Sequence, residues 1–99
     1  VIVGGDQVSY GAVPEGERGY KTMFLNEVKD CIDMNRLHFV NRVPYDTLVS
    51  LLRVSAAHVY LTVPFVLSWS MLEAMSLGAL VIGSATAPVQ EVIEHEKNG

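Results

Sequence analysis

Four short apolar runs alternate along the chain with longer segments in which apolar residues recur every three or four positions. Runs that are almost continuously apolar are typical of strands buried on both faces, whereas the three-to-four spacing predicts amphipathic helices. We expect strands over about 1–4, 37–40, 58–63 and 79–83. We expect helices over about 20–32 and 45–56, from Ser70 to the terminator Gly78, and from Pro88 onward.

The resulting order, β-α-β-α-β-α-β-α, predicts an α/β fold. Such alternation favours a Rossmann-like, doubly wound parallel sheet of about four strands with helices on both faces. Right-handed crossovers would then place every loop that follows a strand at one edge of the sheet. Ligands of open parallel sheets bind outside the carboxyl ends of the strands, so this edge is where we expect chemistry.

The two ends of the chain predict a truncated domain. At 99 residues, the chain has the size of one small domain or of a piece of a larger one. It starts directly on the apolar run 1–4, and it stops at Asn98 and Gly99, a pair typical of the end of a helix and its turn. We therefore expect residues 1–99 to form a single domain that is truncated at both ends.

Composition excludes several classes of function. The net charge is −4 and the seven Lys and Arg residues are scattered, which argues against binding to nucleic acid. Cys31 is the single cysteine, and no Cys/His set has zinc spacing, so we expect neither an internal disulfide nor a metal. No apolar run approaches the roughly 18 residues of a membrane span. We expect a cytoplasmic protein, and attachment to a membrane surface through further parts stays open.

The segment 64–78 holds the best candidate for a binding residue. Glu73 is expected in the first turn of a helix, just past the carboxyl end of the strand 58–63. A carboxylate there can accept two hydroxyl hydrogen bonds, which suits a ribose or another sugar diol. The alternative is structural: in a capping box, Glu73 would only reach back to the backbone N–H of Ser70.

Serine residues near the same helix start are candidates for phosphate binding. Backbone N–H groups at a helix N-terminus attract anions, and Ser68 and Ser70 would add hydroxyl donors. Ser70 is equally well explained as the N-cap, and the two roles are compatible. Arg42 lies on a loop expected at the same edge, where a diphosphate contact and a surface salt bridge are both open. Glu91 is expected in the first turn of the last helix, where a carboxylate ordinarily complements the helix dipole.

Three segments resemble family 4 (group 1) glycosyltransferases. Residues 72–84, L-E-A-M-S-L-G-A-L-V-I-G-S, resemble the family's L-E-A-M-A-x-G-x-P-V-V-x-S segment. Residues 88–93, followed by Asn98 and Gly99, are similar to its P-x-E-V-I…N-G tail, and residues 38–45 are similar to its H-F-x-G-x-V-P-Y segment.

This resemblance implies an architecture and a reaction. The family has the GT-B fold, in which two Rossmann-like domains enclose the active site, and this chain would be most of the C-terminal, donor-binding domain. Its partners would be a missing N-terminal GT-B domain, a nucleotide-diphosphate sugar and an unknown acceptor (a glycan, a lipid or a small molecule). The implied reaction is glycosyl transfer with retention of configuration, with no cofactor or metal, and the fragment alone would be inactive.

The resemblance also implies roles for particular residues. Glu73 would hold the ribose hydroxyls of the donor, and the amides from Ser68 to Leu72 would face the diphosphate or the sugar. The loop at Arg42 and Val43 would lie near the base. No catalytic residue is implied.

Two departures from the family keep other interpretations open. The resemblance covers 37–99 well but 1–36 only loosely. The family carries a second carboxylate eight residues before Glu73, where this chain has Phe65, and the family's G-R…K-G segment is absent. The alternatives are a degenerate, non-catalytic Rossmann-like interaction module and a nucleotide-sugar epimerase of similar architecture.

Overall fold

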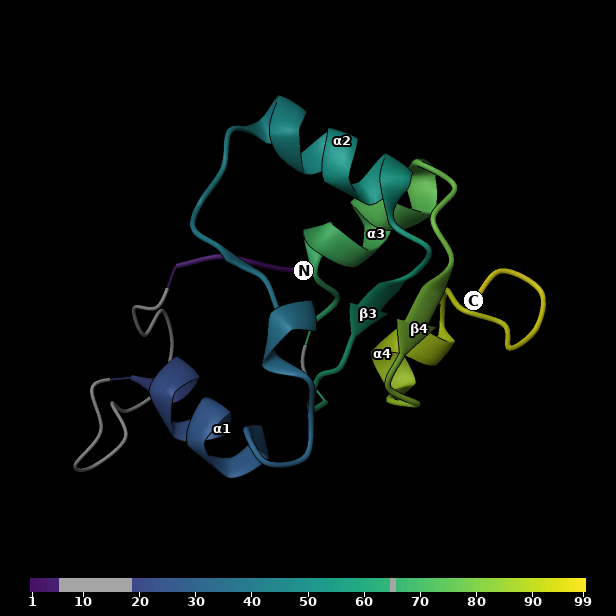
Figure 1. Ribbon diagram of the computed structural model, residues 1–99. Coiled ribbons are helices and arrows are strands. Elements are labelled where there is room, and N and C mark those ends of the chain that lie inside the picture. Colours follow the sequence, from purple (N-terminus) through teal and green to yellow (C-terminus); the bar gives the residue numbers. More distant parts are fainter. Residues whose placement is uncertain (6–18, 65) are drawn as a thin grey trace. The chain divides into compact units, whose positions relative to one another are not determined.

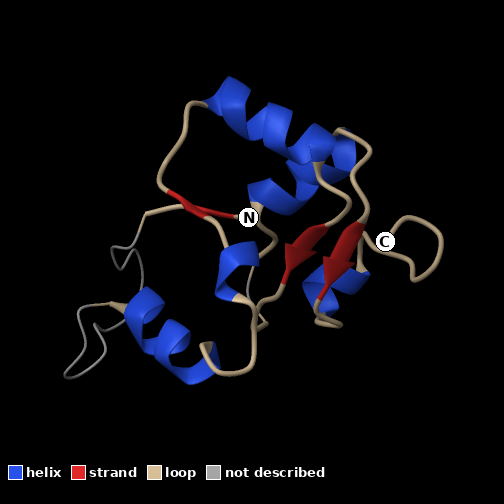
Figure 2. Cartoon of the chain, in the orientation of Figure 1, coloured by secondary structure: helices blue, strands red, loops and turns tan. Residues whose placement is uncertain are grey.

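The computed structural model describes residues 1–5, 19–64 and 66–99 (Figures 1 and 2). Within these residues, strands and helices alternate in the predicted order, with one added 3-10 turn, and most elements are shorter than predicted. In chain order they are β1 (Ile2–Val3), α1 (Tyr20–Val28), η1 (Met34–Arg36), β2 (Phe39–Val40), α2 (Tyr45–Val54), β3 (His58–Tyr60), α3 (Trp69–Ser76), β4 (Val81–Gly83) and α4 (Ala87–Gln90).

The chain forms two compact units, Val1–Pro44 and Tyr45–Gly99, and each contains one two-stranded parallel sheet. In the first unit β1 pairs with β2, and in the second β3 pairs with β4. The prediction of one doubly wound sheet of about four strands is therefore wrong. The alternation and the parallel pairing are present, so the described residues are α/β in character, but strand pairing stays within each unit.

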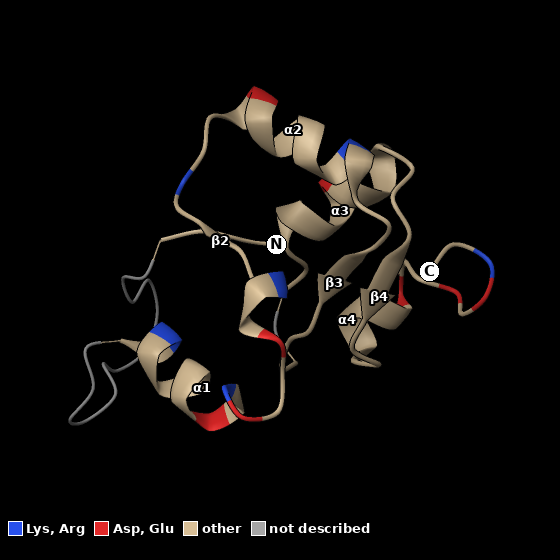
Figure 3. Ribbon diagram, viewed as in Figure 1, with Lys and Arg blue, Asp and Glu red and all other residues tan. Residues whose placement is uncertain are grey.

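The face of the β3–β4 sheet that lies away from the helices explains part of this error. Neither strand carries a Lys, Arg, Asp or Glu residue (Figure 3). Val59 lies opposite Ile82 in the register, and the two side chains are 59% and 51% exposed. Leu61 and Leu80, which flank them, are also exposed. The apolar runs predicted burial on both faces, whereas the helices of the second unit cover one face of this sheet.

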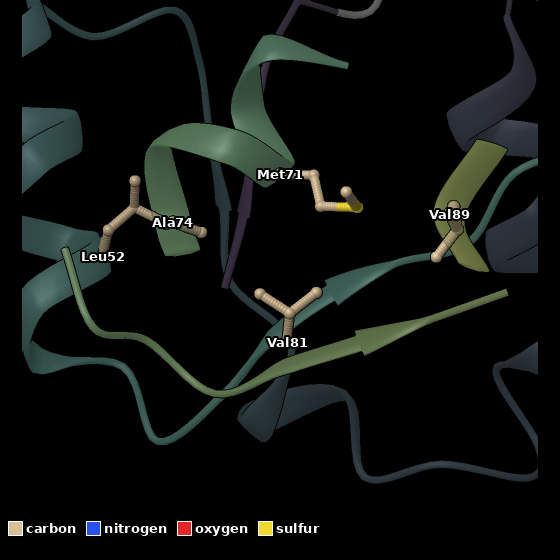
Figure 4. Close-up of a cluster of buried hydrophobic side chains, with 5 residues drawn as sticks. All are labelled: Leu52, Met71, Ala74, Val81 and Val89. Atoms are coloured by element: carbon tan, nitrogen blue, oxygen red, sulfur yellow. The ribbon is translucent and has the colours of Figure 1, made fainter. Parts of the chain in front are cut away.

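The core of the second unit lies on the covered face. Its buried residues come from three helices and one strand: Leu52, Met71, Ala74, Val81 and Val89 (Figure 4). Met71 and Ala74, three residues apart on α3, have no exposed surface, and α3 packs on both strands.

Two glycines shape this unit. Gly78 has a φ of 75° and follows the C-cap Leu77. Its N–H donates to Met75 O at 3.0 Å, and the N–H of Ala79 donates to Ala74 O at 3.0 Å, which is the Schellman arrangement. The predicted helix terminator is confirmed. At Gly83, a Cβ atom would lie 3.0 Å from Cγ1 of Val89, so the missing side chain lets α4 approach β4.

The segment after α4 folds into a turn around Asn98. The Asn98 side chain accepts a hydrogen bond from Glu94 N–H at 2.7 Å and donates one to Val92 O at 2.9 Å. Glu94 also forms an ion pair with Lys97. The turn therefore rests on an amide whose two polar atoms both have backbone partners.

The first unit has no fully buried large side chain among its described residues. Helix α1 ends at Val28, several residues earlier than predicted, and Cys31 lies beyond it with an exposed thiol. Tyr20 and Phe24 stack on one face of α1, with ring centroids 6.2 Å apart. In the described part of the chain, no helix has the length and apolar character that a membrane crossing requires.

Candidate functional site

The start of α3, at the carboxyl end of β3, is built differently from the prediction. Ser68 has extended backbone angles, and its side chain accepts a hydrogen bond from Ser70 N–H at 3.2 Å. Ser68 is therefore the N-cap and the helix begins at Trp69. The predicted capping box between Ser70 and Glu73 is wrong, because the hydroxyl two residues earlier already satisfies the Ser70 amide.

This shift changes the position of Glu73. Counted from Trp69, Glu73 is the fifth helical residue, so it does not lie in the first turn. Its side chain is half-buried, and its carboxylate has no hydrogen bond or ion pair with any residue that the structure describes. Side chains on a helix lean toward its N-terminus, so Glu73 leans over the turn that contains Trp69 and Ser70. Glu73 therefore does not cap the helix, and its carboxylate is available to bind a ligand.

The two serine hydroxyls at this helix start form a pair. Ser68 Oγ and Ser70 Oγ are 2.8 Å apart and share one hydrogen bond. Two hydroxyl groups carry two protons and only one lies between the oxygens, so one O–H remains to donate outward. The N–H of Trp69 also has no partner within the described residues. A hydroxyl and an amide are thus free to donate at the positive end of the helix.

Three amides of the predicted phosphate site are engaged. The N–H groups of Met71 and Leu72 both point to Ser68 O, at 3.2 and 3.4 Å, and the Ser70 N–H donates to Ser68 Oγ. Of the amides expected to face a diphosphate, from Ser68 to Leu72, those of Ser68 and Trp69 have no partner within the described residues. The Trp69 side chain is 80% exposed and lies four residues before Glu73, on the same side of α3.

Ser84 joins the loop that follows β4 to the loop that follows β3. Its Oγ accepts a hydrogen bond from Thr62 N–H at 2.8 Å, and its own N–H donates to Tyr60 O at 3.1 Å. The sequence placed Ser84 at the ligand edge but gave it no role. The available signal was its position directly after an apolar strand, where a hydroxyl can reach the neighbouring strand's loop.

Other predicted residues lie apart from this cluster. Glu91 is the C-cap of α4 and is exposed, so its predicted place in the first turn is wrong; that helix begins at Ala87, one residue before Pro88. Phe65 lies outside the described residues.

Arg42 and Val43 belong to the first unit. They follow β2, where Arg42 is exposed and Val43 is half-buried. The Arg42 Nε atom lies 3.5 Å from the point that a Cβ on Gly5 would occupy, so the guanidinium end of Arg42 lies beside the loop that follows β1.

The chemistry of the α3 start is that of a small polar site. It offers one carboxylate, one free hydroxyl and two backbone amides without a partner among the described residues. No group of three potential metal ligands exists in the described part of the chain. Such a set can hold a hydroxylated ligand that carries an anionic group. Comparisons with protein-family models, with curated proteins and with solved structures gave no match.

Proposed function

We propose that this chain is the donor-binding part of a glycosyltransferase that uses a nucleotide-diphosphate sugar. The observation that carries the proposal is the half-buried Glu73 carboxylate, which has no partner among the described residues and lies one turn from two free donors. A carboxylate of this kind can accept hydrogen bonds from both the 2′- and 3′-hydroxyl groups of a ribose. The L-E-A-M-S-L-G motif around it supports the same assignment.

The donors at the start of α3 complement this carboxylate. The Trp69 N–H and the outward hydroxyl of the Ser68–Ser70 pair favour an anion such as the donor diphosphate. During transfer, negative charge grows on the departing diphosphate, and fixed donors at a helix N-terminus stabilise that charge without reorganisation. The proposal uses residues of the second unit only.

One observation favours a second candidate, a non-catalytic interaction module. The exposed apolar pair Val59 and Ile82 forms a surface that parallel sheets ordinarily cover. A module of this kind would bind a protein through that face and would not need the Glu73 carboxylate.

A comparison of two ligands in two protein variants tests the first proposal. Binding of UDP-, GDP- and ADP-sugars to the chain is measured by calorimetry, and the donor that binds is compared with its 2′,3′-dideoxy analogue. Loss of the two hydroxyls should weaken binding about tenfold in the unmodified chain, because a charged acceptor loses its partners. Glu73→Ala should bind both ligands equally, since the carboxylate that distinguishes them is gone.

The matched control is Glu91→Ala, which removes an exposed carboxylate at the end of α4 and should keep the discrimination. Absence of binding for every donor would contradict the proposal. Undiminished discrimination in Glu73→Ala would contradict the role of Glu73. Turnover of the bound donor by the protein that contains this chain then separates a transferase from an interaction module.

A further inference from the structure

The first unit contains a cavity of about 470 Å³ that no part of the proposed function uses. It is lined by α1, by both strands of the β1–β2 sheet and by the loops that follow these strands. Most of its wall is apolar, including Ile2, Phe24, Val28 and Phe39. Its volume lies in the range of about 300–1,000 Å³ that is typical of sites for one small molecule.

One cation lies in this apolar wall. Lys21 is the only charged residue among the described residues that line the cavity, and its side chain is half-buried. Its Nζ atom lies 4.5 Å from the centroid of the Phe39 ring, in a cation–π contact. No acidic residue in the described part of the chain forms an ion pair with it. The contact with Phe39 holds the ammonium group at the cavity, where no acidic side chain of the described residues pairs with it.

Aromatic and polar groups complete the wall. The rings of Tyr20 and Phe24 are stacked with an interplanar angle of 20°, which presents flat surfaces along α1. At the carboxyl end of the strands, the wall includes Asn41, Gly4 and Gly5. Flat apolar surfaces next to one fixed cation suit a ligand that has a flat apolar surface and a negative charge.

We propose that this cavity binds a planar aromatic anion. The rings of the ligand pack against Phe24 and the aliphatic wall, and its anionic group pairs with the Lys21 ammonium. The proposal needs neither a ribose nor a diphosphate, and it stands independently of the glycosyltransferase assignment. A neutral apolar ligand would leave the cation unpaired, which makes charge the property to test.

Two probes that share their rings but differ in charge provide the test. 8-Anilinonaphthalene-1-sulfonate carries one negative charge, and N-phenyl-1-naphthylamine is its neutral counterpart. Both are titrated by fluorescence into the chain and into Lys21→Met, which keeps an apolar side chain of similar length. The sulfonate should bind about tenfold more weakly to this variant, whereas binding of the neutral probe should change by less than about twofold.

Two further variants define the site. Lys29→Met, at the C-cap of α1 and outside the cavity wall, should leave the binding of both probes unchanged. Phe39→Leu should weaken both, because the ring contributes to the wall and positions Lys21. Far-UV circular dichroism establishes that each variant keeps its helices.

The proposal is overturned if Lys21→Met and the unmodified chain bind the sulfonate equally. It is also overturned if the signal persists in Phe39→Leu but disappears when Val59 and Ile82 are replaced by serine, because the probe would then report the exposed sheet face. Glu73→Gln should leave sulfonate binding intact, and a saturating nucleotide sugar should not displace the probe. Failure of nucleotide-sugar binding alone would therefore contradict only the glycosyltransferase proposal.

Discussion

The hydroxyl oxygen of Ser84 accepts a hydrogen bond from the backbone N–H of Thr62 at 2.8 Å, across 22 residues of sequence. The bond joins the loop after β3 to the loop after β4, and it is partly buried. It sets the separation of the two loops at the carboxyl edge of the sheet, next to the start of α3. Together with the bond from Ser84 N–H to Tyr60 O, it ties the loop that leads into α3 to the loop after β4.

We therefore expect Ser84→Ala to destabilise the second unit by about 1 kcal/mol, because the Thr62 amide loses its acceptor and water restores it only partly. Urea unfolding followed by circular dichroism measures this loss. Ser76→Ala is the matched control: its hydroxyl is exposed and bonds only to Glu73 O within the same helix, so its loss should be smaller. Equal losses in the two variants would contradict the role of Ser84.

The two serines at the start of α3 should respond differently to substitution. Ser68→Ala removes the N-cap and should lower the free energy of unfolding by about 1 kcal/mol. Ser70→Ala keeps the cap and should lower it by less, since only the hydroxyl pair is lost. A larger loss in Ser70→Ala would show that the capping box written in the sequence is the one that forms.

Substitution of Gly78 measures the cost of a positive φ angle separately from any steric clash. A Cβ atom at this position would meet no atom within 4 Å, so the cost of Gly78→Ala comes from the φ of 75° alone. We expect a loss of about 1 kcal/mol in the free energy of unfolding. Gly78→Asn should lose less, because asparagine tolerates the left-handed region. Equal stability of all three chains would mean that the Schellman turn is not maintained in solution.

Met71 is the most sensitive core position. Its side chain is fully buried in the core cluster that also contains Leu52, Val81 and Val89, so Met71→Ala should cost about 2–5 kcal/mol by leaving a cavity. Met71→Leu keeps the volume and should cost less than about 1.5 kcal/mol. Leu72→Ala, at the adjacent residue with 37% exposure, is the control and should be milder than Met71→Ala. Thermal unfolding of the three variants gives the order directly.

The elements of this chain could be predicted from sequence, but the sheet could not. Helical spacing predicted a helix at α2, and the terminator Gly78 was predicted at the end of α3, because these signals are local. Sheet pairing depends on contacts between residues far apart in the sequence, and apolar runs do not encode which strands meet. The runs around Val59 and Ile82 fit a strand buried on both faces, yet the helices of the second unit cover only one face of its sheet.

At the candidate site, the geometry differs from the one that the sequence predicted. Ser68 and Ser70 lie at the start of α3, and Glu73 is the fifth residue of that helix. The spacing S-x-x-E favoured Ser70 as the N-cap. In the structure, Ser68 has the extended backbone of an N-cap, and its hydroxyl accepts the hydrogen bond of the Ser70 amide. Residue type and spacing do not predict which of two serines, two residues apart, becomes the N-cap. The assignment of Arg42 and Val43 to a nucleotide base stays a prediction.

The turn around Asn98 has a consequence for the chemical lifetime of the protein. An asparagine followed by glycine ordinarily loses ammonia when the next backbone nitrogen attacks its side-chain carbonyl carbon. Here both ends of the Asn98 amide are held, by Glu94 N–H and by Val92 O, so the group must first leave these partners. Spontaneous conversion of Asn98 to aspartate and isoaspartate should therefore be slowed in proportion to the fraction of time that this turn is open, and mass spectrometry of the ageing chain measures that conversion.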